Sequence, residues 1–130
     1  MTAPRIVIVE DEPITLQALR MIVMALGCEV LTASTAEEGL ELALQTPRPD
    51  AALVDLKLRG SSYDGLELIR RLVKHPVLEG LRVLAHTASV SEDQRRAAQQ
   101  AGAHGILLKP FRARDVAEAL GPAVTERERS

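Results

Sequence analysis

Apolar residues along this chain fall into two patterns, short continuous runs and longer stretches in which they recur every three or four positions. The continuous runs are 6–9, 30–31, 51–54, 83–85 and 106–108. Apolar runs of this length, bounded by turn residues and separated by helical patterns, are typical of strands buried on both faces of a parallel sheet. Strands that alternate with helices in this way are joined by right-handed crossovers, so the pattern predicts a doubly wound α/β domain.

Helical periodicity fills the intervals between these runs, and several helix starts carry capping residues. The predicted helices begin at or near Pro13, Ser34, Gly65, Ser91 and Arg112. Ser34–Glu37 and Ser91–Gln94 match the capping-box pattern, in which two side chains satisfy backbone N–H groups at the helix start. Gly121 and Pro122 predict an early end to the last helix, followed by a frayed segment at 125–130.

Size and composition suit one ordinary globular domain. The chain has 130 residues, of which 46% are hydrophobic and 26% charged, and we assign 1–122 to the domain and 123–130 to a charged tail. The net charge of −2 offers no general attraction to nucleic acid or anionic lipid. No signal-peptide pattern is present, and the longest apolar segment, 21–26, is far shorter than the ~20 residues that span a bilayer. With a single cysteine, Cys28, these features predict a soluble cytoplasmic protein that binds neither membrane nor nucleic acid directly.

Four of the apolar runs end on side chains suited to phosphoryl chemistry. The first run leads into Glu10 and Asp11, the third into Asp55, the fourth into Thr87 and the last into Lys109. In open α/β sheets, ligands bind outside the carboxyl ends of the strands. Three acids, a hydroxyl and an ammonium are therefore expected to converge at one edge of the sheet.

These strand ends resemble those of the response-regulator receiver domains of bacterial two-component signalling. The similarity covers residues 4–120 and rests on motifs in a fixed order: Val9-Glu10-Asp11-Glu12-Pro13, Asp55, Asp64-Gly65, Thr87-Ala88, Ala101-Gly102-Ala103 and Lys109-Pro110-Phe111. The resemblance implies a flavodoxin-like, five-stranded parallel sheet of order 2-1-3-4-5, flanked by five helices. It also implies an aspartyl phosphate as the signal, a bound divalent cation, and a histidine kinase or histidine phosphotransfer protein as the phosphate donor.

On this resemblance Asp55 is the phosphoacceptor, since a carboxylate can take up a phosphoryl group as an acyl phosphate that water later hydrolyses. Glu10, which stands where the family usually has Asp, and Asp11 would bind Mg²⁺ together with Asp55 and the backbone carbonyl of Lys57; Mn²⁺ is an acceptable substitute. Mg²⁺ favours such hard oxygen ligands, and a dication relieves the mutual repulsion of crowded acids. The protein would be a signalling module and not an enzyme, apart from hydrolysis of its own phosphate.

Phosphoryl-binding roles follow for three further residues. Lys109 would pair with a phosphoryl oxygen as a mobile point charge, and the resemblance suggests a cis bond to Pro110 that directs the lysine inward. Thr87 would donate its hydroxyl to the phosphoryl group, and Ala88 is small enough to leave the site open. Taken one by one, these residues fit a plainer interpretation, as a capping Asp, a solvated Lys and a β-branched strand former.

The chain departs from the family pattern in the loop after Asp55 and at the switch position. That loop is longer than usual, lacks the usual Pro and carries Lys57 two positions beyond the acceptor. Ile106 stands where the family usually has an aromatic ring that turns inward as the threonine moves, so the switch formed by Thr87 and Ile106 is expected to be weak. The early end expected for the last helix weakens the face through which many members dimerise. We therefore expect a monomer or a weak dimer.

The first predicted helix carries more apolar residues than one core-facing strip needs. Its inward face is predicted to consist of Ala18, Leu19, Ile22, Val23 and Leu26. Ile14, Met21 and Ala25 form a second strip, for which two interpretations stay open. They either widen the core-facing side or form a docking surface for the helices of the phosphate donor, which the family binds in this region.

Three alternative functions agree less well with the sequence than the phosphoacceptor function does. A pseudo-receiver that binds partners without phosphorylation would be expected to lack an acid or the lysine, and neither is missing. A haloacid-dehalogenase-like phosphatase with an aspartyl-phosphate intermediate would have a second acid where this chain has Lys57. A nucleotide-binding Rossmann domain would have a Gly-rich loop after its first strand. His75, His86 and His104 lack metal-ligand spacing and are interpreted as structural or solvated, and the downstream protein target stays unidentified.

Overall fold

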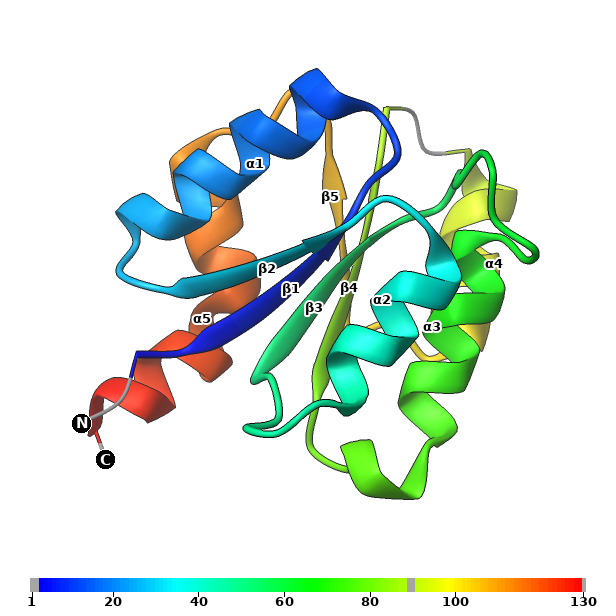
Figure 1. The fold of residues 1–130 in the computed structure, drawn as a ribbon. Coiled ribbons are helices and arrows are strands. Elements are labelled where there is room, and N and C mark those ends of the chain that lie inside the picture. Colours follow the sequence, from blue (N-terminus) through cyan, green and yellow to red (C-terminus); the bar gives the residue numbers. More distant parts are fainter. Residues whose placement is uncertain (1–2, 89–90, 130) are drawn as a thin grey trace.

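The chain folds into a five-stranded sheet with helices on both faces (Figure 1). The computed structural model describes residues 3–88 and 91–129. The strands are β1 Arg5–Val9, β2 Glu29–Ala33, β3 Ala51–Asp55, β4 Arg82–Thr87 and β5 Gly105–Leu108. The helices are α1 Pro13–Ala25, α2 Ala36–Leu44, α3 Gly65–Lys74, α4 Glu92–Ala101 and α5 Ala113–Arg129, with a 3₁₀ turn η1 at Pro76–Leu78.

All neighbouring strands pair in parallel, in the order β2-β1-β3-β4-β5. This order and the five flanking helices confirm the fold expected from the resemblance. It places β1 beside β3 and β3 beside β4, so that the ends of these three strands lie next to one another at one edge of the sheet. None of the described helices is both long and apolar enough to cross a bilayer.

Two apolar layers separate the sheet from its helices. α1 and α5 cover one face, and α2, α3 and α4 cover the other (Figure 1). Alternate residues of a strand serve the two layers, because successive side chains point to opposite faces of a sheet. On β4, Leu84 packs in the layer under α1 and α5, whereas Ala85 packs in the layer under the other three helices. His86 therefore points toward α1 and α5, and Thr87 points the other way.

Helix starts use the predicted capping chemistry, with a shift of one residue at α2. At α4 the capping box is confirmed, since the backbone N–H of Gln94 donates to Ser91 Oγ and the N–H of Ser91 donates to Gln94 Oε1, both at 3.1 Å. The N-cap of α2 is Thr35 and not Ser34, and its hydroxyl accepts from the N–H of Glu38 at 3.2 Å. Glu38 in turn accepts from the N–H of Ser34. Thr35 and Glu38 thus replace the predicted pair Ser34 and Glu37 at the helix start. Glu37 is left to accept from the N–H of Ser62 in a loop.

The predicted early end of the last helix is wrong. α5 continues through Gly121 and Pro122 to Arg129, and it includes the part of 123–130 that was expected to form a tail, Ser130 lying outside the described residues. A proline in a helix removes one backbone donor and is costly, but it does not by itself forbid the turns that follow. Ala123, one residue past the proline, still packs against the core layer under α1 and α5. Packing therefore outweighs the local preference to stop.

The second apolar strip of α1 faces solvent and not the core. Leu19 and Val23 are fully buried, as predicted, but Ala18 is exposed, contrary to the prediction. The strip consists of exposed residues: Ile14, with 79% of its surface accessible, Met21 with 61%, and Ala25. The interpretation that this strip widens the core-facing side is therefore wrong.

A close approach of α3 to the end of β3 requires a glycine. A Cβ atom at Gly65 would overlap the carbonyl oxygen of Asp55 and would lie 2.8 Å from the Cα atom of Leu56. The N–H of Gly65 donates to the Leu56 carbonyl at 3.3 Å. Asp64 caps the helix by accepting from the N–H of Glu67 at 2.9 Å. The Asp-Gly pair thus starts α3 against the backbone of Asp55.

Gly65→Ala tests this constraint. We expect the free energy of unfolding to fall by about 2–3 kcal/mol, because the added methyl group must push apart two packed backbone segments. Gly121→Ala is the matched control, since nothing lies within 4 Å of a Cβ there and alanine favours a helix by up to about 1 kcal/mol. Urea unfolding of both variants measures the difference. Equal stability of the two would show that α3 can move away from β3 without cost.

Candidate functional site

The end of the sheet brings two acids and one ammonium into direct contact. Glu10 follows β1, Asp55 ends β3 and Lys109 follows β5. The Nζ atom of Lys109 lies 2.7 Å from Glu10 Oε1 and 2.8 Å from Asp55 Oδ2. The other oxygen of Asp55, Oδ1, accepts from the N–H of Lys57 at 3.0 Å. These contacts come from residues far apart in sequence, and we call Glu10, Asp55 and Lys109 the strand-end cluster.

The two carboxyl groups of the cluster are both buried, but they titrate differently because their hydrogen bonds differ. Glu10 is only 1% exposed, and this burial, followed by its hydrogen bond with Asp55, raises its pKa from 4.5 to about 7 against the opposing effect of Lys109. Burial alone would raise the pKa of Asp55 as well, but the hydrogen bonds from Glu10, Lys109 and the N–H of Lys57 outweigh it and lower the pKa. Near neutral pH both forms of Glu10 are therefore populated, the neutral form prevailing below about pH 7, whereas Asp55 is a carboxylate.

Lys109 stays charged in this environment. Burial opposes the charged form of its amine, but the hydrogen bonds and the negative charge of Asp55 and Glu10 prevail and raise its pKa. The peptide bond between Lys109 and Pro110 is cis, as the resemblance suggested. The site thus contains an ionised nucleophile candidate with a cation 2.8 Å away.

His86 belongs to the same site, which sequence reasoning missed. It is fully buried and is the register partner of Asp55 across β3 and β4, which agrees with the structural interpretation of this residue and excludes the solvated one. Its Nδ1 atom lies 3.6 Å from Glu10 Oε1, and its ring meets that of Phe111 edge-on at 5.5 Å between centroids. Burial lowers the pKa of His86 to about 4, so the imidazole is neutral at pH 7. The alternation along β4 places it one residue before Thr87 and on the opposite face, which is a signal that the sequence contained.

Other residues predicted for the site lie nearby but outside the cluster. Asp11 Oδ2 accepts from the N–H of Arg59, in the loop after β3, at 3.0 Å. Thr87 is buried and its carbonyl accepts from the N–H of Lys109 at 2.9 Å, whereas Ala88 is exposed. Ile106 is partly buried against the layer under α2, α3 and α4. Thr87 and Ile106 therefore share one face of the sheet, opposite to the face of the cluster.

The loop after β3 is fastened to α2, a feature that the sequence did not reveal. The N–H of Ala36 donates to Ser61 Oγ at 2.9 Å, and the N–H of Ser62 donates to Glu37 Oε1 at 2.9 Å. With the contact between Arg59 and Asp11, these bonds hold the loop over the ends of β1 and β3. The longer loop is thus an ordered part of the site.

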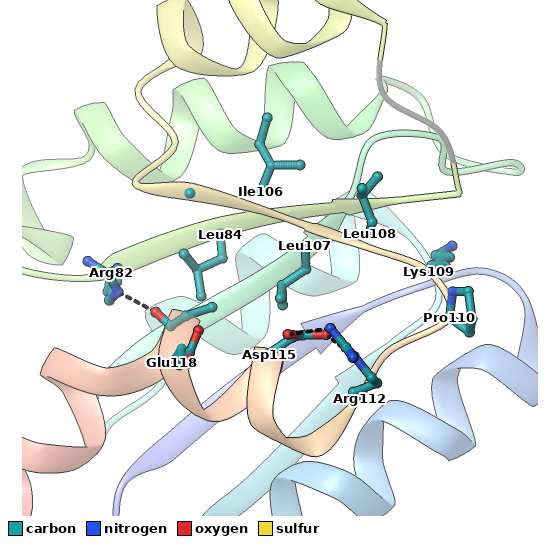
Figure 2. A pocket seen from close by; sticks show the side chains of 12 residues that line it. Arg82, Leu84, Ile106, Leu107, Leu108, Lys109, Pro110, Arg112, Asp115 and Glu118 are labelled. Carbon is teal, nitrogen blue, oxygen red and sulfur yellow. Dashed lines mark hydrogen bonds and ion pairs between the residues drawn. The ribbon is translucent and has the colours of Figure 1, made fainter.

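A groove of about 610 Å³ lies on the other side of β5, between that strand and α5 (Figure 2). Figure 2 shows Leu107 directed toward α5 and Ile106 directed to the opposite side of β5. Both arginines of the groove are already paired, since Arg82 donates to the carbonyl of Ala119 and Arg112 pairs with Asp115. We therefore assign the candidate chemistry to the strand-end cluster and not to this larger hollow.

The two acids of the strand-end cluster, together with the neighbouring His86, have the composition of a cation site. One ligand atom each from Glu10, Asp55 and His86 all lie within 4.8 Å of one another. Carboxylate oxygens are the ligands that Mg²⁺ favours, and a divalent ion would offset the repulsion between the two acids. The residues present therefore fit a divalent cation.

Comparisons with known proteins agree on one family. The family model described as response regulator receiver domain matches residues 6–121. The phosphate regulon transcriptional regulatory protein PhoB of Rhizobium meliloti is 38% identical over 108 residues, which cover 83% of this chain and 46% of that protein. The positive alginate biosynthesis regulatory protein of Pseudomonas aeruginosa is 36% identical over 91% of this chain and 46% of its own length. This chain thus spans about half the length of these two relatives.

Solved structures show the same similarity. A response regulator receiver domain protein from Methanospirillum hungatei, described as CheY-like, superposes with a TM-score of 0.82 at 30% identity. The alignment covers 98% of both chains.

The raised pKa of Glu10 predicts how stability depends on pH. Folded Glu10 keeps its proton up to about pH 7, whereas the unfolded chain loses it near pH 4.5, so this contribution to stability is lost as the pH rises across that window. Relative to wild type, Glu10→Gln should gain about 2–3 kcal/mol between pH 4.5 and 8. Denaturant unfolding in EDTA at several pH values measures the difference, and a constant difference would contradict the raised pKa.

Proposed function

The chain belongs to the family of response regulator receiver domains, and we propose that it is the phosphoacceptor of a two-component pathway, phosphorylated on Asp55 by a histidine kinase or a histidine phosphotransfer protein. One observation carries this proposal, the ionised Asp55 held 2.8 Å from the Lys109 ammonium at the end of β3. A carboxylate in this state is a nucleophile, and the adjacent cation favours the approach of an anionic phosphoryl group.

In the proposed transfer, an Asp55 oxygen attacks the phosphorus atom of a phosphohistidine. The phosphorus–nitrogen bond breaks, the imidazole nitrogen leaves, and an acyl phosphate remains on Asp55. Lys109 would then move its ammonium from the carboxylates to a phosphoryl oxygen, as a flexible point charge can. The Thr87 hydroxyl would donate to another oxygen, and the small exposed Ala88 leaves room for the group.

A divalent cation fits this function. Glu10, Asp11, Asp55 and the backbone carbonyl of Lys57 would hold Mg²⁺, with Mn²⁺ as an alternative. When bound, the cation neutralises the charge of the phosphoryl oxygens. Asp11 Oδ2 accepts from the N–H of Arg59 in the loop after β3, so a metal held by this carboxylate would bind next to a loop contact.

Partners are proposed from the exposed strip of α1. Ile14, Met21 and Ala25 face solvent on the helix that begins just after Glu10 and Asp11. A flexible, apolar, Met-containing strip suits a helical partner, such as the helices of the phosphate donor. Signalling would continue through contacts with a further protein, and the phosphate would be lost by hydrolysis catalysed by the receiver itself.

Asp55→Asn tests the function. We expect acetyl phosphate with Mg²⁺ to add one phosphoryl group to the wild-type protein, visible by intact mass, and to add none to the variant. Asp93→Asn, at an exposed acid of α4, should be labelled like the wild type. EDTA or Asp11→Ala should reduce the rate of labelling by at least an order of magnitude, because each removes the cation that neutralises the phosphoryl oxygens.

Labelling that survives in Asp55→Asn would overturn the acceptor assignment. A folded wild-type protein that is not labelled by acetyl phosphate or by a phosphohistidine donor would favour the pseudo-receiver.

The switch at Ile106 predicts a weak effect on association. A ligand shifts a conformational equilibrium only by its differential interaction with the two states. Ile106 changes the burial of less area than a large ring would, so phosphorylation should stabilise a second conformation of the β4–α5 face only slightly. Sedimentation with beryllofluoride and Mg²⁺ should therefore show a monomer throughout. A clear shift to a dimer would show that Ile106 does not limit the switch.

A further inference from the structure

His86 takes no part in the proposed phosphoryl transfer, yet it lies at the centre of the site. It follows Ala85 on the buried strand β4, and its side chain is completely inaccessible to solvent. Phosphoryl transfer to Asp55 needs a carboxylate, a cation and donors to oxygen, and a buried imidazole is none of these. The residue therefore calls for a separate explanation.

Neither ring nitrogen of His86 has a hydrogen bond of regular geometry within residues 3–88 and 91–129, and the carbonyl groups of Val9 and Leu53 make only weak polar contacts with the ring. A buried polar group without such a partner costs free energy, and native proteins keep few of them. Nδ1 is directed at the cluster, 3.6 Å from Glu10 Oε1. This distance is too long for a hydrogen bond. It is close to the separation of about 3.0–3.4 Å between neighbouring ligands on an ion that binds nitrogen and oxygen at about 2.1 Å.

We propose that His86 supplies a nitrogen ligand to a divalent first-row transition-metal ion that Glu10 and Asp55 bind through oxygen, so that this site takes Mn²⁺ or a later ion in preference to Mg²⁺. The proposal rests on the proposed function only in that it names the cation of the same site. The three ligand atoms already lie within 4.8 Å of one another, so the side chains would draw closer together around one ion.

The choice of ion follows from the ligand set. Mg²⁺ demands hard oxygen ligands and keeps its waters, and an imidazole offers it little. Imidazole nitrogen suits the transition ions, whose affinity for such mixed sites rises from Mn²⁺ towards Cu²⁺. A site built from carboxylates alone lacks the nitrogen ligand that strengthens this preference. His86 is thus a specificity-determining ligand in this chain.

Lys109 makes the binding of this ion competitive. Its ammonium occupies Glu10 Oε1 and Asp55 Oδ2, two of the oxygens that the ion would use. A dication that binds there displaces the ammonium from at least one carboxylate. Lys109 is only half-buried and is attached by a flexible stem, so it can turn toward an incoming phosphoryl oxygen. Metal binding would then free the lysine for its role in phosphoryl binding.

The experiment uses Mn²⁺ alone as the probe, with the full chain. Loss of the free-ion electron paramagnetic resonance signal gives the affinity for Mn²⁺, and competition gives the affinity for Mg²⁺. We expect Mn²⁺ to bind at least tenfold more tightly than Mg²⁺. Electron spin echo modulation should show a coupled ¹⁴N nucleus in the wild-type protein. In His86→Leu the nitrogen coupling should vanish and Mn²⁺ affinity should fall at least tenfold, while Mg²⁺ affinity stays within about twofold.

His86→Phe is the second variant, because it keeps the edge-on ring contact with Phe111 and removes both nitrogens. His104→Gln is the matched control, since His104 lies outside the cluster, where its Nδ1 accepts from the N–H of Val83 at 2.9 Å. It should retain the nitrogen coupling. Bound Mn²⁺ without nitrogen coupling, or equal affinities for Mn²⁺ in wild type and both His86 variants, would overturn the proposal.

Phosphorylation separates this proposal from the proposed function. If Asp55 is labelled with acetyl phosphate and Mg²⁺ but no nitrogen coupling is found, the His86 ligand is refuted and the phosphoacceptor function stands. If nitrogen coupling is found but Asp55 is never labelled, the metal site stands and the phosphoacceptor function is refuted.

Discussion

Contact of the Lys109 ammonium with two buried carboxyl groups is the interaction on which the site depends. Glu10 and Asp55 are almost fully buried, and two carboxylates so close together would repel each other strongly in a poorly solvated place. Lys109 lies within 3 Å of both, and the raised pKa of Glu10 favours its neutral form, which lowers the negative charge beside Asp55. When Glu10 holds a proton, the ionised Asp55 lies next to the charged Lys109, and Asp55 remains available as a nucleophile.

Because alternate side chains point to opposite faces of the sheet, the acids and the switch residues lie on different faces. Glu10, Asp55 and His86 point toward α1 and α5, whereas Thr87 and Ile106 point toward α2, α3 and α4. Thr87, whose hydroxyl is proposed to bind the phosphoryl group, shares the face of Ile106 and would connect a change at Asp55 with that face. His86 and Thr87 are neighbours on that strand, so a movement of the backbone there alters the cluster and the switch face together.

The loop after β3 adds a second constraint to the site. Hydrogen bonds from Arg59 to Asp11, from Ala36 to Ser61 and from Ser62 to Glu37 connect it with the end of β1 and with α2. The carboxylate of Asp11, which could bind a metal, thus accepts a hydrogen bond from the backbone of this loop. A ligand that binds Asp11 therefore contacts a side chain that also holds the loop, which links the site to the position of the loop.

The sequence by itself determined the parts of this protein that depend on local pattern. Apolar runs, capping residues and turn glycines predicted the strands and most helix starts, and strand ends in a parallel sheet must meet, so Glu10, Asp55 and Lys109 could be identified together. Only the tertiary structure decided the rest. Strand register places His86 beside Asp55. Contacts between distant segments bury Glu10, which raises its pKa, and bring the N–H of Arg59 to Asp11. The continuation of α5 beyond Pro122 and the exposure of Ile14 and Met21 were likewise set by packing, because local propensity is weaker than the burial of a helix face.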